Sequence, residues 1–82
     1  MTQTPIDFEI LDFEIRGEFI QLDQLLKATG LVHSGGAAHQ VIAEGRVTVD
    51  GIVELRKRAK LRAGQKVSYQ KQDILLRSVS VA

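Results

Sequence analysis

The dipeptide Asp50-Gly51 restricts the fold of this chain more than any other feature, because it separates two short runs rich in β-branched residues. These runs cover 46–49 and 52–54. Asp-Gly supplies the two positive-φ positions that a type I′ turn requires, and such a turn joins antiparallel strands. The sequence therefore predicts a β-hairpin over 46–54, which any fold of the chain has to contain.

Two short helical patterns precede this hairpin. Four residues fall at i, i+3, i+4 and i+7, the spacing of a helix with one apolar face, and Gly30 is a natural C-terminal stop. They are Leu22, Leu25, Leu26 and Thr29. A second helix is expected to begin after a Ser34 cap and to end at Gly45, with Ala37, Ala38, Val41 and Ile42 as its apolar stripe. The two predicted helices and the residues between them form a helix–loop–helix pair.

Strand patterns flank these elements. Residues 6–15 alternate apolar and acidic side chains, and the apolar phase shifts at Leu11, which predicts a bulge or break there. A turn is expected at 63–65, a strand around Val67 and Tyr69, and a final strand from 74 to 81. We expect 13–15 to pair with 79–81.

The predicted fold is α+β, with the helix pair packed on a small, mostly antiparallel sheet. Residues 1–11 are an extension or extra strand, and 12–82 form a single domain.

Length and composition limit the kind of protein this can be. With 82 residues and no cysteine, the chain excludes disulfides, thiolate metal sites and the large catalytic folds. No apolar run approaches the ~20 residues of a membrane span, and the acidic N-terminus lacks a signal-peptide layout. His33 and His39 are not spaced for a metal site, and no nucleophile–base pair is evident. We therefore expect a cytoplasmic, non-catalytic protein without cofactor or membrane association.

The net charge of +1 hides a strong asymmetry along the chain. Residues 1–26 contain six acids and one base, which give −5, whereas 27–82 contain ten bases and four acids, which give +6. Between residues 55 and 72 there are seven bases and no acid. Because a local potential steers association even when the total charge is small, the basic half indicates an anionic partner.

The basic residues are densest in 55–62, which reads LRKRAKLR and is called the basic segment below. An extended conformation would place Leu55, Ala59 and Leu61 on one side as apolar anchors. Four cations would lie on the other side, roughly 6.5 Å apart, namely Arg56, Arg58, Lys60 and Arg62. Such a row suits a phosphate backbone, and four to six contacts predict a log–log salt slope of about −3 to −4 on single strands. A solvated edge strand protected by charge is the alternative interpretation.

The start of the second helix is a weaker candidate. Ser34 can cap, while Gly35 and Gly36 expose backbone N–H groups to an anion, although the same residues suit a simple cap and tight entry. His39 is expected on the polar face, where it could touch a phosphate. The three phenylalanines lie in apolar patterns and are predicted to be core. Few aromatic side chains are then left for base stacking, which favours recognition of shape and backbone in folded RNA.

Together these segments resemble a known family. The stretches FIQLDQLLK at 19–27, GLVHSGG at 30–36 and VIAEGRVTVDG at 41–51 resemble the RNA-binding domain named after small-subunit ribosomal protein four, the S-four-like domain. The run ELRKRAKL at 54–61 is similar to its small stand-alone bacterial branch, labelled YbcJ-like. The resemblance covers about 17–70 and implies an alpha-L RNA-binding motif, made of two helices and a hairpin, that binds structured RNA.

The resemblance also implies which residues face the RNA. Many relatives carry basic residues at the positions of Gln21 and Gly35, so their absence here shifts the contacts toward the basic segment. The candidate RNA-binding residues are Lys27, Ser34, Gly35, Gly36, His39, Arg46, Arg56, Lys57, Arg58, Lys60 and Arg62.

The sequence thus predicts a monomeric RNA-binding domain whose partner is ribosomal or transfer RNA, or the ribosome and its precursors. Two alternatives stay open. One is a protein-interaction module that docks an acidic partner, and the other is an accessory subunit of an RNA-modifying enzyme.

Overall fold

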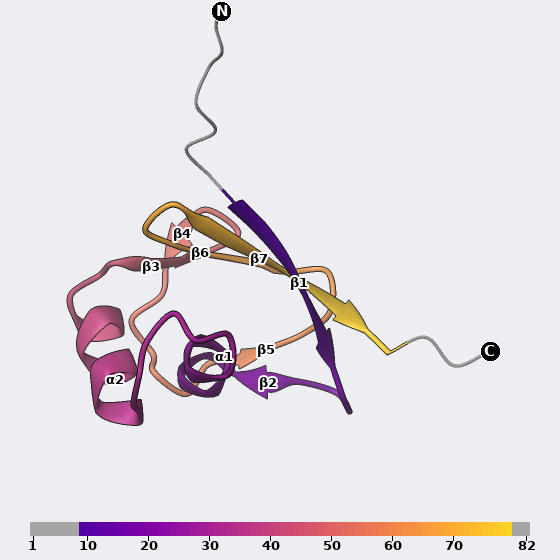
Figure 1. The fold of residues 1–82 in the computed structure, drawn as a ribbon, viewed down its shortest axis with the longest axis horizontal. Helices are drawn as coiled ribbons and strands as arrows, with labels where there is room; N and C mark the ends of the chain where they lie inside the picture. Colours follow the sequence, from indigo (N-terminus) through magenta and orange to yellow (C-terminus); the bar gives the residue numbers. More distant parts are fainter. Residues whose placement is uncertain (1–8, 80–82) are drawn as a thin grey trace, which may run out of the picture.

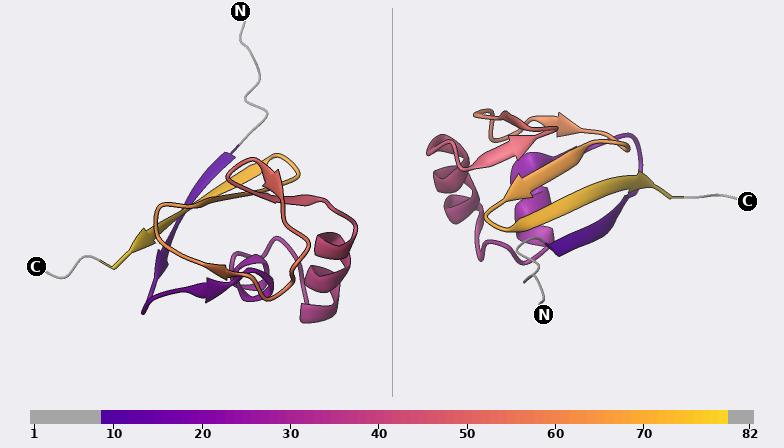
Figure 2. Two further views of the ribbon diagram at one scale, coloured as in Figure 1. Left: turned by 180° about the vertical axis from the view of Figure 1, so that it is seen from behind. Right: turned by 90° about the horizontal axis from the view of Figure 1, so that it is seen from above.

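The computed structural model describes residues 9–79, in which both helices lie on one side of a five-stranded sheet (Figure 1). A second, two-stranded sheet lies beside the first helix (Figure 2). The elements in chain order are β1 (Glu9–Ile15), β2 (Ile20–Gln21), α1 (Leu22–Ala28), α2 (Gly35–Ala43), β3 (Val47–Val49), β4 (Ile52–Val53), β5 (Lys60–Leu61), β6 (Lys66–Tyr69) and β7 (Gln72–Ser78). The chain is therefore α+β, as predicted.

The hairpin predicted at Asp50-Gly51 is confirmed. Strands β3 and β4 pair antiparallel, with Val49 opposite Ile52. Asp50 has φ 52° and Gly51 has φ 85°, so both central residues adopt the positive φ that a type I′ turn demands. This local signal fixes the direction in which the chain enters the basic segment.

The helix pair also forms where the sequence places it. Helix α1 ends at Ala28, and Gly30, with φ 80°, follows its C-cap Thr29 as the predicted stop. The Ser34 hydroxyl accepts a hydrogen bond from the Ala37 N–H at 3.1 Å and so caps α2. The predicted apolar stripes meet the sheet. The buried core residues are Ile15, Leu22, Leu25, Leu26, Val32, Ala38, Val41, Ile42, Val47, Val49, Ala59, Leu61, Val67, Tyr69, Ile74 and Leu76. Because α1 has only seven residues, this packing and not its intrinsic propensity holds it.

The large sheet has the order β1-β7-β6-β3-β4, and every pair except β1–β7 is antiparallel. The first and last strands were expected to pair at 13–15 with 79–81. They do pair, but Phe13 lies opposite Leu76 and Ile15 opposite Ser78, so the predicted register is wrong. Residues 80–82 lie outside the described range. Acidic β1 thus occupies one edge of the sheet, and β4, from which the basic segment follows, occupies the other.

The bulge or break predicted at Leu11 is absent. Strand β1 pairs one-to-one with β7 from Glu9 to Ile15. Leu11, Phe13 and Ile15 pack at the core, whereas Ile10, which suggested the opposite phase, is 64% exposed. An edge strand can leave one apolar side chain in solvent at little cost, so no reversal of faces is needed. Because β1 begins at Glu9, it crosses the boundary between 1–11 and 12–82. The assignment of residues 1–8 to an extension stays a prediction, since they lie outside the described residues.

Candidate nucleic-acid interface

The basic segment folds over the N-terminus of α1. The Leu22 N–H donates to the Ala59 carbonyl at 3.0 Å, and the Asp23 N–H donates to the Lys57 carbonyl at 3.0 Å. The first N–H groups of a helix have no partner within the helix, and Gln21 at the N-cap provides no side-chain acceptor. Backbone carbonyls of the basic segment take that role, and this anchors the segment while its basic side chains remain exposed.

The predicted continuous ribbon is therefore wrong for the first half of this segment. Lys57 and Arg58 form a turn, in which the Ala59 N–H donates to the Arg56 carbonyl at 3.1 Å. Within the segment, only Lys60 and Leu61 belong to a strand, β5. Ala59 and Leu61 are buried as predicted, but Leu55, predicted as an apolar anchor, is 63% exposed. The chain turns here because the carbonyls of Lys57 and Ala59 accept hydrogen bonds from the first N–H groups of α1, which a fully extended segment would not allow.

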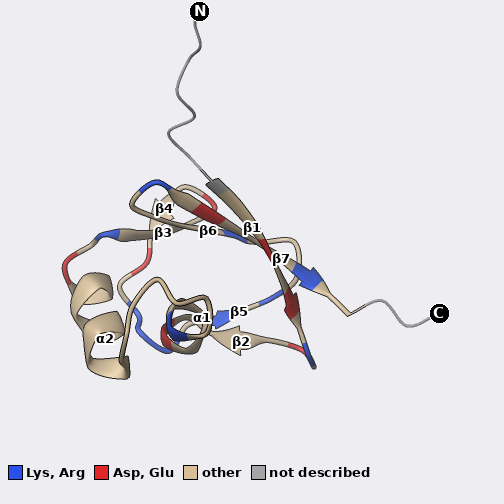
Figure 3. Ribbon diagram, viewed as in Figure 1, with Lys and Arg blue, Asp and Glu red and all other residues tan. Residues whose placement is uncertain are grey.

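Four cations of the segment have no carboxylate partner among residues 9–79. Lys57 and Arg58 are exposed at the turn. The Lys60 ammonium lies 4.9 Å from the centroid of the Phe19 ring, and the Arg62 guanidinium donates to the Glu18 carbonyl at 3.5 Å. Figure 3 shows these basic positions following one another from the turn through β5, beside α1. They give one edge of the molecule a concentrated positive charge.

Arg56 behaves differently from these four, because Glu54 holds its guanidinium. The Nε and Nη2 groups of Arg56 donate to the two carboxylate oxygens of Glu54 at 3.0 and 3.1 Å, and the Arg56 backbone N–H adds a third bond at 3.0 Å. The side-chain bond from Arg56 lowers the pKa of Glu54 below its ordinary value of 4.5, and Glu54 raises the pKa of Arg56. The guanidinium plane of Arg56 is therefore held in one orientation, and the carboxylate of Glu54 balances most of its positive charge.

A broad open hollow of about 650 Å³ lies on the basic segment. It combines apolar surface with cationic side chains, and its lining consists of Leu55, Arg56, Lys57, Arg58, Ala59 and Lys60. Ligand sites in proteins typically span about 300–1,000 Å³ and pair an apolar floor with a few polar groups. The hollow falls within this size range, although four of its six lining residues are cationic.

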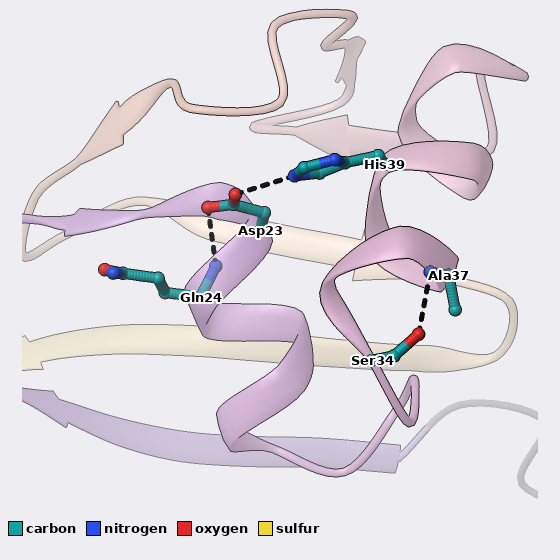
Figure 4. Close-up of polar contacts among 5 residues, drawn as sticks. All are labelled: Asp23, Gln24, Ser34, Ala37 and His39. Carbon is teal, nitrogen blue, oxygen red and sulfur yellow. Dashed lines mark hydrogen bonds and ion pairs between the residues drawn. The ribbon is translucent and has the colours of Figure 1, made fainter.

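His39 is tied to α1 (Figure 4). Its Nε2 lies 2.9 Å from the Asp23 Oδ2, and the Asp23 side chain is only 13% exposed. The other carboxylate oxygen of Asp23 accepts from the Gln24 N–H at 2.8 Å. Because the Asp23 N–H also binds the Lys57 carbonyl, Asp23 joins α2 to the basic segment through α1. The Nε2 of His39 is engaged within the protein in this arrangement.

The remaining predicted site residues lie apart from this cluster. Ser34 and Gly36 are exposed and Gly35 is half-buried at the start of α2, and no hydrogen bond within residues 9–79 joins them to the basic segment. Lys27 is exposed in the last turn of α1. Arg46, between α2 and β3, pairs with Glu44 at 3.3 Å. The structure brings together the candidates of 56–62 and links His39 to them, but not the others.

The acidic half of the chain does not neutralise the basic segment. The Asp12 carboxylate on β1 pairs instead with Arg77 on neighbouring β7, at 3.2 Å. Strand β1 lies at the sheet edge opposite β4. In the described part of the molecule, acidic β1 and the four cations of the basic segment therefore form no ion pairs with one another.

Three residues that shape this surface were not predicted from the sequence to take part in it. Glu54 lies two positions before Arg56, on the same side of an extended chain, so the spacing alone could have indicated the ion pair. Asp23 is not among the candidate residues predicted from the sequence. Phe19 was predicted to be core but is 36% exposed beneath Lys60, a contact that depends on the β2–β5 pairing, for which the sequence gives no clear pattern. Phe8 lies outside the described residues.

Within residues 9–79, no three His, Asp or Glu side chains gather in a metal-binding arrangement. Neither of the two helices in that range has the length and apolar character needed to cross a bilayer.

Comparison with known proteins gives consistent matches. The family model described as S4 domain matches residues 13–77. Over 50 residues, 61% of this chain and 71% of each relative, the chain is 54% identical to YbcJ of Escherichia coli K12, whose name proposes RNA binding, and to YbcJ of Shigella flexneri, named as uncharacterized. The solution structure of E. coli YbcJ, described as revealing an alpha-L motif involved in RNA binding, matches with a TM-score of 0.61 and 35% identity over 94% of both chains.

Proposed function

Because the chain belongs to the S4 domain family, we propose that it binds structured RNA, without catalysing a reaction, through the basic segment. The main support is the group of cations at Lys57, Arg58, Lys60 and Arg62, which have no carboxylate partner among residues 9–79. Neutralising a phosphate with such a side chain releases condensed counterions, which supplies affinity without sequence readout.

The rigidity of the backbone beneath these cations favours binding. The two hydrogen bonds from α1 to the carbonyls of Lys57 and Ala59 fix the segment before any partner arrives. An already ordered surface loses less conformational freedom on binding than a flexible loop does. The acidic β1 strand lies at the far edge and would orient the molecule with its basic edge toward the polyanion.

We assign a secondary role to the start of α2. Ser34, Gly35 and Gly36 expose the positive end of a nine-residue helix, which suits a phosphate of the same RNA. Lys27 and Arg46 are exposed and could add peripheral contacts, although Arg46 is shared with Glu44. We place His39 as a residue that holds α2 against α1 through Asp23.

Ribosomal or transfer RNA, free or in ribosomal precursors, is the class of target we propose, with a monomer acting in the cytoplasm. This rests on the family, which takes its name from a ribosomal protein.

Titration with two polyanions at two salt concentrations tests this function against docking of an acidic protein. We expect a hairpin RNA to bind tightly at low salt and more weakly at high salt, and polyglutamate of matched charge to bind far more weakly at both. Polyglutamate binding as tight as that of the RNA would contradict the proposal.

A further inference from the structure

The hollow on the basic segment is not explained by phosphate binding alone. A row of cations needs no cavity and no exposed apolar side chain, yet Leu55 and Ala59 line this hollow together with Arg56. Leu55 is an apolar side chain that is nevertheless 63% exposed. Water covers this apolar surface in the free protein, and its burial would favour a partially apolar ligand.

Arg56 adds a flat surface to the same hollow. Glu54 engages one edge of the guanidinium through Nε and Nη2, while the Arg56 side chain remains 80% exposed. An arginine held in this way has lost much of its rotational freedom, and guanidinium planes stack on aromatic rings, including nucleobases. The ion pair thus prepares Arg56 for stacking and leaves phosphate binding to its neighbours.

We propose that this hollow binds one unpaired nucleobase of the bound RNA, with Arg56 stacked on the base, Leu55 in apolar contact with it, and Lys57 and Arg58 on the flanking phosphates. The inference rests on the proposed RNA binding and extends it. A base inside a helix is stacked on both sides and cannot enter such a hollow, so the preferred RNA carries a bulge or loop. The charge of the lining matches a nucleotide, since the cations meet its phosphates and the apolar surface meets its base.

Two hairpin RNAs that differ only in one bulged 2-aminopurine test this inference. The unmodified protein should prefer the bulged RNA by about ten-fold, a modest effect for a stacked base. The fluorescence of the 2-aminopurine should also change on binding, because its stacking partners change. Equal affinity for both RNAs, with no fluorescence change, would overturn the base site while leaving RNA binding intact. If neither RNA binds, the proposed function fails as well.

Matched variants separate stacking from charge. Arg56→Lys keeps the positive charge but removes the plane, so the preference should fall below about three-fold while affinity for the fully paired hairpin is unchanged. Leu55→Ser should act in the same direction. The control Ile52→Ser removes an apolar side chain of similar exposure outside the hollow and should keep the full preference. Loss of preference in the control, or its retention in both test variants, would contradict the assignment.

Discussion

Replacing Lys57 and Arg58 together by alanine removes two cations without disturbing the backbone that carries them. Both side chains are exposed, and the bond from α1 to this turn uses the Lys57 carbonyl, which alanine retains. The thermal midpoint of the variant should therefore match that of the unmodified protein, and any change in RNA affinity should come from lost charge.

The size of the effect follows from the number of cations without carboxylate partners. If Lys57, Arg58, Lys60 and Arg62 each neutralise one phosphate, the log–log salt slope on single-stranded regions is about −2.8, and two contacts leave about −1.4. Raising salt from about 50 to about 200 mM should then weaken binding of the unmodified protein about 50-fold, and that of the variant only about seven-fold. The slope stays at the lower end of the sequence-based expectation because Glu54 already occupies Arg56.

Fluorescence anisotropy with a labelled hairpin RNA that has a long single-stranded loop measures the slope across this salt range. The matched control replaces Lys71 and Arg77 by alanine, which removes the same formal charge from the β6–β7 turn and from β7. This control should retain a slope close to that of the unmodified protein. Equal slopes for the two variants would refute the argument, because net charge and not the basic segment would then determine binding.

Three further predictions concern the supports of this surface. Leu26→Ala, at a fully buried position, should lower the free energy of unfolding by about 2–5 kcal/mol in a urea titration, and a loss well under that range would mean the core is misassigned. Ser34→Ala removes the acceptor for the Ala37 N–H and should cost about 1 kcal/mol, with faster amide exchange confined to the start of α2. The Glu54 carboxyl, followed by NMR, should titrate below 4.5, so the stability from its pair with Arg56 is present above the unfolded-state pKa and is lost as pH falls through the lower folded-state value. Titration at or above 4.5 would exclude that pair.

Much of the fold is predictable because its signals are local. The Asp50-Gly51 turn, the Ser34 cap and the Gly30 stop each depend on residues within a few positions of one another, and the structure confirms all three. The helical stripes of α1 and α2 likewise follow from spacing alone. The register of β1 against β7 depends on contacts about 60 residues apart, so alternation in β1 could indicate a strand but not its exact partners.

The shape of the candidate site was less predictable for the same reason. Alternation in the basic segment favoured a straight ribbon. The N–H groups of Leu22 and Asp23 have no acceptor within α1, so they bind carbonyls of the segment, and the chain turns there. Nothing near Lys57 in the sequence shows that its carbonyl will accept a hydrogen bond from α1. The sequence shows that the cations are concentrated in one segment. Only the structure shows that Glu54 holds Arg56, while the other four have no carboxylate partner among residues 9–79.

A map of amide chemical-shift changes on addition of a bulged hairpin RNA tests the central claim most directly. The largest changes should fall on residues 55–62 and on the α1 N-terminus that holds them, with smaller ones at the start of α2. Changes concentrated on β1 and β7, with residues 55–62 unaffected, would show that the RNA-binding surface has been assigned to the wrong edge of the molecule.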